Sequence, residues 1–163
     1  MIFDFLSAQN IPFQRVDHPA VFTCEEADAL VPPLGGSKTK NLFLRDGKGQ
    51  RHFLVSTTSQ KAIDLKALSK LLEVSGLGFA SPERLAKFLK LTPGSVTLLG
   101  VLNDEAKQVQ VVIDRELWDS GALQCHPLVN TSTILIRTED LERFFKLTGH
   151  APRILALPEK LKE

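Results

Sequence analysis

The chain has 163 residues, of which 43% are hydrophobic, and a formal net charge of +1. This length and apolar content suit a single domain over residues 1–163, with a core large enough to fold alone. A net charge so close to zero excludes a protein whose whole surface binds polyanions. Any contact with nucleic acid must therefore come from a local patch of Lys and Arg.

The sequence contains no pattern typical of a metal site, a membrane span or a signal peptide. Cys24 and Cys125 form neither a CxxC pair nor a zinc-ligand spacing, so both are expected to be reduced thiols. The four histidines lack ligand spacing, and neither a metal nor another cofactor is expected. No apolar run approaches the ~18 residues of a membrane span, and MIFDFLSAQN has no signal-peptide pattern. We therefore expect a cytoplasmic protein without a membrane partner.

Helices are predicted where apolar residues recur every three or four positions, often behind a capping residue. Thr23 with Glu26 is a capping box, Ser81-Pro82 is a strong start signal, and Thr138 is expected to cap a helix that ends at Gly149. The predicted helices are 2–8, 23–31, 64–73, 81–90 and 138–149, with a shorter helical turn at 115–120.

Strands are predicted where apolar residues alternate with polar ones or run between turn residues. The clearest case is a hairpin in which DGKG joins the strands of NLFLRDGKGQRHFLVST. The segment LTPGSVTLLGVLND predicts a turn, a strand and a second turn. The other predicted strands are 12–18, 109–114, 123–125, 133–136 and 152–158. With about seven strands and five helices intermixed, the sequence predicts one α/β domain with a mixed, curved sheet.

Polar residues at loops that adjoin the predicted strands are the candidates for chemistry. Lys40 ends a Gly-rich loop that lacks the P-loop order, and it can reach a phosphate or a developing negative charge, or it can be an ordinary solvated lysine. Gly94 and Gly100 can let backbone N–H groups approach a bound carbonyl, or they can simply shape turns. His126 can act as a base, as an anchor or as a structural residue. Cys125 precedes it on a strand and should face the other way, which argues against a Cys–His pair.

Five blocks together resemble the freestanding prolyl-tRNA editing proteins of the YbaK/ProX superfamily. In chain order they are GGSKTKNLFLRD, STTSQKAIDLKALSKLL, LTPGSVTLLGVLND, VVIDREL and CHPLVNTST. The resemblance covers about residues 13–157, and KNLFLRD and HPLVNTST resemble the alanine-specific branch, known as ProXp-ala or PrdX. It implies a barrel-like sheet surrounded by helices.

The resemblance also implies an activity. A protein of this kind is a trans-editing deacylase that hydrolyses alanine wrongly esterified to proline tRNA, without a cofactor. The partners that it implies are the 3′ acceptor end of the tRNA and prolyl-tRNA synthetase. It implies Lys40 and His126 as the catalytic residues. The substrate-binding residues that it implies are Asn41, Gly94, Gly100, Asn130 and Thr133.

Two other functions remain open from the sequence. One is a deacylase for another mischarged amino acid, such as serine, threonine or cysteine. The other is a non-catalytic tRNA-binding module, against which stand the low net charge and the lack of interleaved aromatic and basic residues. Lys38, Arg45 and Lys61 are candidates for contacts with the tRNA.

Overall fold

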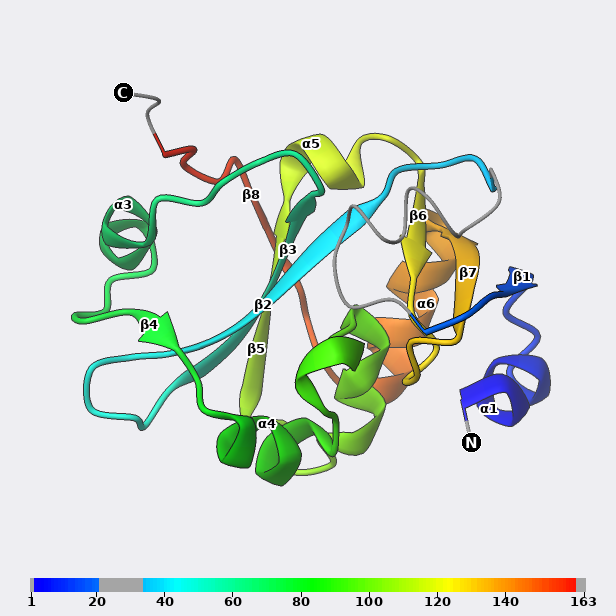
Figure 1. Ribbon diagram of the computed structural model, residues 1–163, viewed down its shortest axis with the longest axis horizontal. Coiled ribbons are helices and arrows are strands. Elements are labelled where there is room, and N and C mark those ends of the chain that lie inside the picture. The colour runs from blue at the N-terminus through cyan, green and yellow to red at the C-terminus, as the bar shows by residue number, and fades with distance from the viewer. Residues whose placement is uncertain (1, 21–33, 161–163) are drawn as a thin grey trace.

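The computed structural model describes residues 2–20 and 34–160 (Figure 1). The predicted helix at 23–31 lies outside these residues. The remaining predicted helices are confirmed as α1 (Ile2–Ala8), α3 (Leu65–Leu71), α4 (Pro82–Leu89), α5 (Arg115–Trp118) and α6 (Thr138–Thr148).

The caps explain most of these helix boundaries. The side chains of Asp64 and Ser81 accept hydrogen bonds from the first turns of α3 and α4, as their sequence positions predict. Gly149 ends α6 with φ +82°, in the left-handed region that glycine adopts at little cost. The expected Thr138 cap is wrong, because Arg137 occupies the cap position and Thr138 is the first helical residue. The Thr138 hydroxyl instead donates to the carbonyl of Gly121.

The predicted hairpin and strands form two sheets in the described residues rather than one. A three-stranded antiparallel sheet has the order β1-β7-β6, and a five-stranded mixed sheet has the order β4-β2-β3-β5-β8. Their strands are β1 (Gln14–Asp17), β2 (Thr39–Arg45), β3 (His52–Thr58), β4 (Gly78–Phe79), β5 (Val109–Asp114), β6 (Ala122–Cys125), β7 (Ser132–Arg137) and β8 (Arg153–Leu155). The mixed α/β class is confirmed, but the single curved, barrel-like sheet is wrong.

A short backbone connection joins the two sheets. The Ser37 N–H donates to the carbonyl of Ala122, and the Gln124 N–H donates to the carbonyl of Ser37, each at 2.9 Å. The Thr39 hydroxyl donates to the carbonyl of Gln124 at 2.7 Å. The polar loop before β2 therefore runs beside β6, and one isolated bridge replaces the continuous ladder that a closed barrel would need.

The segment between α4 and β5 corrects another prediction. It contains two 3-10 helices, η1 (Pro93–Ser95) and η2 (Leu98–Asn103), and no strand. An uninterrupted buried apolar run such as LLGVL has no period that separates strand from helix. Here the Thr97 side chain accepts from the Leu99 N–H and begins a helical turn.

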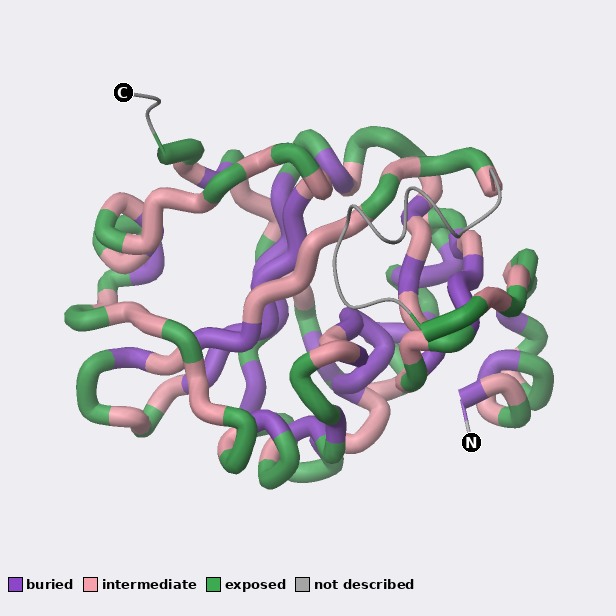
Figure 2. Tube along the Cα trace, in the orientation of Figure 1, coloured by how far each residue is buried: buried purple, intermediate pink, exposed green. Residues whose placement is uncertain are grey.

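The five-stranded sheet lies between two clusters of apolar side chains, and strands β3 and β5 are largely buried (Figure 2). On one face, Phe43 and Leu54 pack in the larger cluster, which includes Leu89 of α4; we call this the α4 face. On the other face, Leu44 and Phe53 pack in the cluster that includes α3; we call this the α3 face. None of the described helices is both long and apolar enough to cross a bilayer.

The connection between the sheets predicts that a substitution of Gly36 destabilises the protein. This residue has φ +67°, and a Cβ on it would lie 2.9 Å from the Ala122 carbonyl oxygen and would also meet Leu135. Gly36→Ala should therefore lower the free energy of unfolding by about 2 kcal/mol or more. Gly35 is a matched control, since its φ is +82° but nothing lies within 4 Å of an added Cβ. Gly35→Ala should cost only about 1 kcal/mol. Equal losses in urea unfolding would contradict this account of the connection.

Candidate functional site

The start of strand β2 presents two predicted site residues to opposite faces of the sheet. Lys40 pairs with Thr57 and Asn41 pairs with Ser56 in the antiparallel register of β2 and β3. Because side chains alternate along a strand, Lys40 and Thr57 lie on the α3 face, whereas Asn41 and Ser56 lie on the α4 face. The two neighbours therefore begin two different polar environments at one end of the sheet.

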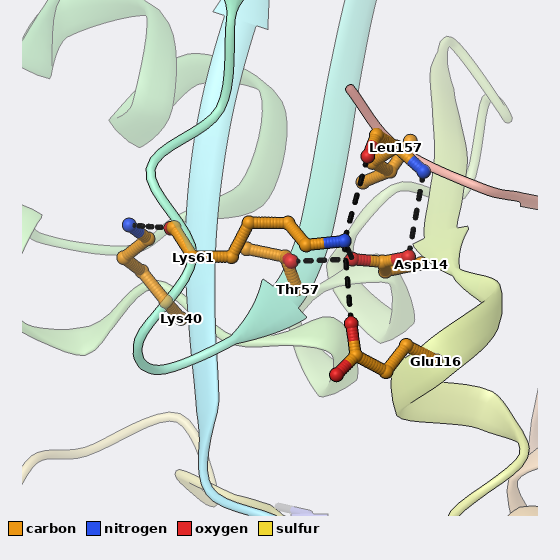
Figure 3. A network of polar contacts seen from close by, with 6 residues as sticks. All are labelled: Lys40, Thr57, Lys61, Asp114, Glu116 and Leu157. Atoms are coloured by element: carbon orange, nitrogen blue, oxygen red, sulfur yellow. Dashed lines mark hydrogen bonds and ion pairs between the residues drawn. The ribbon is translucent and has the colours of Figure 1, made fainter. Parts of the chain in front are cut away.

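On the α3 face, Lys40 belongs to a connected network of polar groups (Figure 3). Its ammonium donates to the backbone carbonyl of Lys61, in the loop after β3. The Lys61 side chain in turn forms ion pairs with Asp114 at 2.8 Å and with Glu116 at 3.3 Å. The carboxylate of Asp114 also accepts from the Thr57 hydroxyl at 2.7 Å.

Burial and charge determine the protonation of this network. The Asp114 side chain is only 1% exposed and that of Lys61 is 13% exposed. Burial alone would raise the pKa of Asp114, but hydrogen bonds from Lys61, Thr57 and the backbone of Leu157 outweigh burial and lower the pKa. Burial alone would lower the pKa of Lys61, but its hydrogen bond and charge interaction with Asp114, supported by Glu116, raise the pKa. Both groups are therefore charged near neutral pH.

The ion pair changes the expectation for Lys61. A lysine that contacts the tRNA should present its ammonium to solvent, but this ammonium is held by two carboxylates and by the carbonyl of Leu157. Lys61 is thus a structural cation in this structure. This role has no local sign in the sequence, because Asp114 lies 53 residues further along the chain.

On the α4 face, two buried polar atoms are without partners. The Asn41 side-chain nitrogen donates to the Val96 carbonyl at 3.3 Å, which ties β2 to the linker between η1 and η2. The Asn41 Oδ1 and the Ser56 Oγ are the only buried side-chain polar atoms without a hydrogen bond in the described part of the chain. Since an unpaired buried polar atom costs about 1–3 kcal/mol, two such atoms on directly paired residues indicate a place for a polar ligand or water. Ser56 was not among the predicted site residues.

The two predicted glycines differ in their surroundings. Gly94 lies in the middle of η1, next to the linker whose Val96 carbonyl Asn41 contacts. Gly100 is buried within η2, and a Cβ on it would lie 2.7 Å from Leu91. Its N–H donates to the Thr97 carbonyl. Close packing thus accounts for Gly100, while Gly94 lies nearer to the polar residues of β2.

His126 follows the last residue of β6, and its imidazole is partly buried. Its Nδ1 lies 3.4 Å from the Ser132 carbonyl, an acceptor only, so Nδ1 carries the hydrogen in this contact. The Nε2 is then the acceptor of a neutral ring. Burial is the main cause that lowers the pKa of His126, and the nearby His18 lowers it further. The ring is therefore neutral at pH 7.

A second histidine, which the sequence did not single out, lies at the same place. The His18 Nε2 is 2.8 Å from the Thr133 hydroxyl, and its Nδ1 is 2.8 Å from the Pro19 carbonyl. Thr133 is on β7, whereas Asn130 lies in the bend between β6 and β7. The structure thus brings Thr133, His126 and His18 together at one end of the three-stranded sheet. No spacing rule could have found His18, because 115 residues separate it from Thr133.

Cys125 gives no support for thiol chemistry. Burial raises the pKa of its thiol to about 12, so the nucleophilic thiolate is scarce at neutral pH. This agrees with the expectation that Cys125 and His126 do not form a nucleophile pair.

The segments that carry the two groups of predicted residues are linked where the sheets are connected. The Thr39 hydroxyl, one residue before Lys40, donates to the carbonyl of Gln124, two residues before His126. Lys40 itself bonds to Lys61 on the α3 face rather than to any of the other predicted site residues. A separate cavity of about 430 Å³, between α5, α6 and β8, is lined by none of the predicted residues.

Known proteins provide an independent comparison. The model of the aminoacyl-tRNA editing domain family matches residues 18–144. The chain is 39% identical over 152 residues to the prolyl-tRNA editing protein ProX of Acetoanaerobium sticklandii, with 93% of each chain covered. It is 39% identical over 155 residues to prolyl-tRNA synthetase associated domain-containing protein 1 of Danio rerio, covering 94% of this chain and 84% of that protein.

The fold has a counterpart among solved structures. The crystal structure of hypothetical protein APE2540 superposes with a TM-score of 0.75 at 15% identity and covers 96% of this chain and 97% of that chain. This match supports the fold alone, whereas the family match and the two relatives cover most of the sequence. The chain therefore belongs to the aminoacyl-tRNA editing domain family, within the YbaK/ProX superfamily of deacylases that its sequence blocks resemble.

Proposed function

We propose that the protein is a trans-editing hydrolase that removes alanine from mischarged Ala-tRNA(Pro). The observation that carries this proposal is the 39% identity to a prolyl-tRNA editing protein over 93% of both chains. The motifs KNLFLRD and HPLVNTST, which resemble the alanine-specific branch, support the choice of amino acid. The substrate is the ester at the 3′ end of the tRNA, and association with prolyl-tRNA synthetase is part of the proposal.

The size of the amino acid explains why such an activity is needed. A synthetase pocket shaped for proline discriminates against a smaller side chain by only about 1–3 kcal/mol. A second site that admits a methyl group and excludes a pyrrolidine ring removes the errors. Discrimination then comes from steric exclusion of proline, which can be far stronger than the loss of a few contacts.

The reaction requires few protein groups, because an aminoacyl ester is already reactive. Water adds to the ester carbonyl and forms an oxyanion, the bond to the 3′ oxygen breaks, and that oxygen takes a proton. Family resemblance implies that the 2′-hydroxyl of the adenosine assists the water. The protein then has to position the ester and stabilise negative charge, as oxyanion sites do.

The described residues suit these tasks. Lys40 gives one of its three N–H donors to the Lys61 carbonyl, and the other two can bind a phosphate or the oxyanion. The unpartnered oxygens of Asn41 and Ser56 can bind the polar groups of the adenosine or the amino acid. His126 offers the Nε2 lone pair of a neutral ring to the α-amino group or the water, while Thr133 and Asn130 support that wall.

A panel of charged tRNAs tests this function directly. The protein is expected to hydrolyse Ala-tRNA(Pro) and to leave Pro-tRNA(Pro) and Cys-tRNA(Pro) intact, as measured by release of labelled amino acid. Faster hydrolysis of Ser-, Thr- or Cys-tRNA would assign it to another editing substrate. Binding of the tRNA with no hydrolysis of any ester would identify a non-catalytic binding module and would overturn the proposal.

A further inference from the structure

We propose that the buried ion pair between Asp114 and Lys61 positions the Lys40 ammonium for the reaction, so that Asp114 and Lys61 are positioning residues of the editing site. The inference rests on the proposed function for its kinetic part. Its structural part, a coupling between Asp114 and Lys40, is measurable without any substrate.

The first step is the way in which Lys40 is held. Its ammonium donates to a neutral backbone carbonyl rather than to a carboxylate. A carboxylate partner would neutralise the charge, whereas a carbonyl orients the ammonium and leaves its full positive charge available to an anion. The position of the Lys61 carbonyl therefore sets the position of the Lys40 charge.

The second step is the way in which the Lys61 carbonyl is itself held. The Lys61 side chain reaches from the β3–α3 loop to Asp114, the last residue of the buried strand β5. Asp114 is held in its turn by the Thr57 hydroxyl and the Leu157 N–H. Figure 3 shows these contacts as one continuous series that starts at Lys40 and ends at β5. The loop that carries the carbonyl is thus anchored to the buried sheet.

The third step concerns charge. Lys61 brings a second cation into the network, and its side chain extends away from Lys40 toward Asp114 (Figure 3). Because Lys61 is paired with Asp114 and Glu116, its charge is compensated, and among the described residues Lys40 remains as the uncompensated cation of this network. A buried pair as a whole adds little net stability, although removing one partner is strongly destabilising, and this is consistent with a positional role.

The backbone offers a competing explanation that the experiment must separate. Residues 62–64 also bond to the C-terminal segment, through Asp64 to Pro158 and Lys160 to Ala62. If these bonds alone fix the loop, removing the ion pair will not move the Lys61 carbonyl. The variant to test is Asp114→Asn, which keeps the shape and an acceptor for Thr57 but removes the charge.

The matched control is Asp104→Asn. Asp104 is also a buried carboxylate, 4% exposed, that accepts from the Val109 N–H and contacts His150. The same substitution there tests whether lost stability, by itself, reproduces the effect. A second pair of variants tests the cation that reaches Asp114: Lys61→Arg keeps it and Lys61→Met removes it.

The decisive measurement is the side-chain ammonium signal of Lys40 in the full-length protein labelled with ¹⁵N-lysine, assigned with Lys40→Ala. In the wild type this signal is expected to be protected from exchange with water, and Asp114→Asn and Lys61→Met should broaden it or remove it. Asp104→Asn and Lys61→Arg should preserve it. An unchanged Lys40 signal in Asp114→Asn would overturn the proposal.

The kinetic measurement then relates position to catalysis. Asp114→Asn should lower kcat for Ala-tRNA(Pro) roughly tenfold to a hundredfold, with little change in KM, because the charge is misplaced and not lost. Lys61→Arg should retain most of the rate, and Asp104→Asn should do the same at a temperature where both variants are folded. An equal loss in Asp104→Asn would also overturn the proposal. If the wild type hydrolyses no ester, the proposed function fails, while the ammonium signal still decides the coupling.

Discussion

Lys40→Ala is expected to lower the rate of Ala-tRNA(Pro) hydrolysis by about 10²- to 10³-fold and to leave the protein folded. The loss follows from the two N–H donors of the Lys40 ammonium that remain after its bond to the Lys61 carbonyl. Removing one preorganised donor from a developing oxyanion costs a factor of this size. Folding should survive, because Lys40 is near the start of β2 and is only partly buried. Single-turnover deacylation and a thermal unfolding curve measure the two effects.

Lys70→Ala is a suitable control for the loss of charge. Lys70 is an exposed residue in α3, the helix that packs on the same face of the sheet as Lys40, and the substitution changes the net charge equally. Its rate should remain within about twofold of the wild type, because exposed charges far from a site are screened by salt. Similar losses in the two variants would mean that Lys40 acts through the general charge of the protein, which contradicts its assigned role.

The second large effect is expected at His126, where the rate should depend on pH. The role proposed for the imidazole requires its neutral form, and burial, helped by the nearby His18, lowers its pKa below the ordinary value of 6.5. The rate should therefore be constant from pH 8 down to about 6.5 and should fall only at lower pH, as protonation removes the Nε2 acceptor. His126→Ala should lose about 10²-fold at pH 7. The enzymatic rate is obtained after subtraction of the spontaneous ester hydrolysis at each pH.

Two variants identify the group that titrates. His126→Gln keeps a polar side chain but cannot be protonated, so its residual rate should lose the acidic fall. His18→Gln should keep the fall, with its midpoint moved to slightly higher pH, because the positive charge that opposes protonation of His126 is gone. A fall that persists in His126→Gln and disappears in His18→Gln would assign the pH dependence to His18.

The elements that could be predicted are those whose signals are local. Asp64 and Ser81 cap their helices as expected, and the hairpin around DGKG forms as predicted. These features depend on contacts among residues close in the chain, so a short window of sequence contains their cause. The strand predicted within residues 91–104 was wrong for a related reason. A fully buried apolar run has the same composition in a strand and in a helical turn.

For the candidate site, too, the local features could be predicted from the sequence and the long-range contacts could not. The blocks around Lys40 and His126 identified the family, and the comparisons confirm that membership. The opposite faces of Lys40 and Asn41 follow from the alternation of side chains along β2. The sequence could not show that Ser56 lies beside Asn41, or that His18 lies beside Thr133. Each enters the site through a partner strand, and the sequence alone does not say which strands pair.

By itself, the sequence determined the family, most of the helices and strands, and the side chains that are chemically able to act. The tertiary structure decided that the strands form two sheets joined at Ser37 rather than one barrel, and that the Lys61 ammonium is bound to Asp114 rather than free for the tRNA. The physical reason is the distance along the chain over which each interaction acts. Capping and periodicity act over a few residues, whereas strand pairing and buried ion pairs join distant segments and depend on how the whole chain packs.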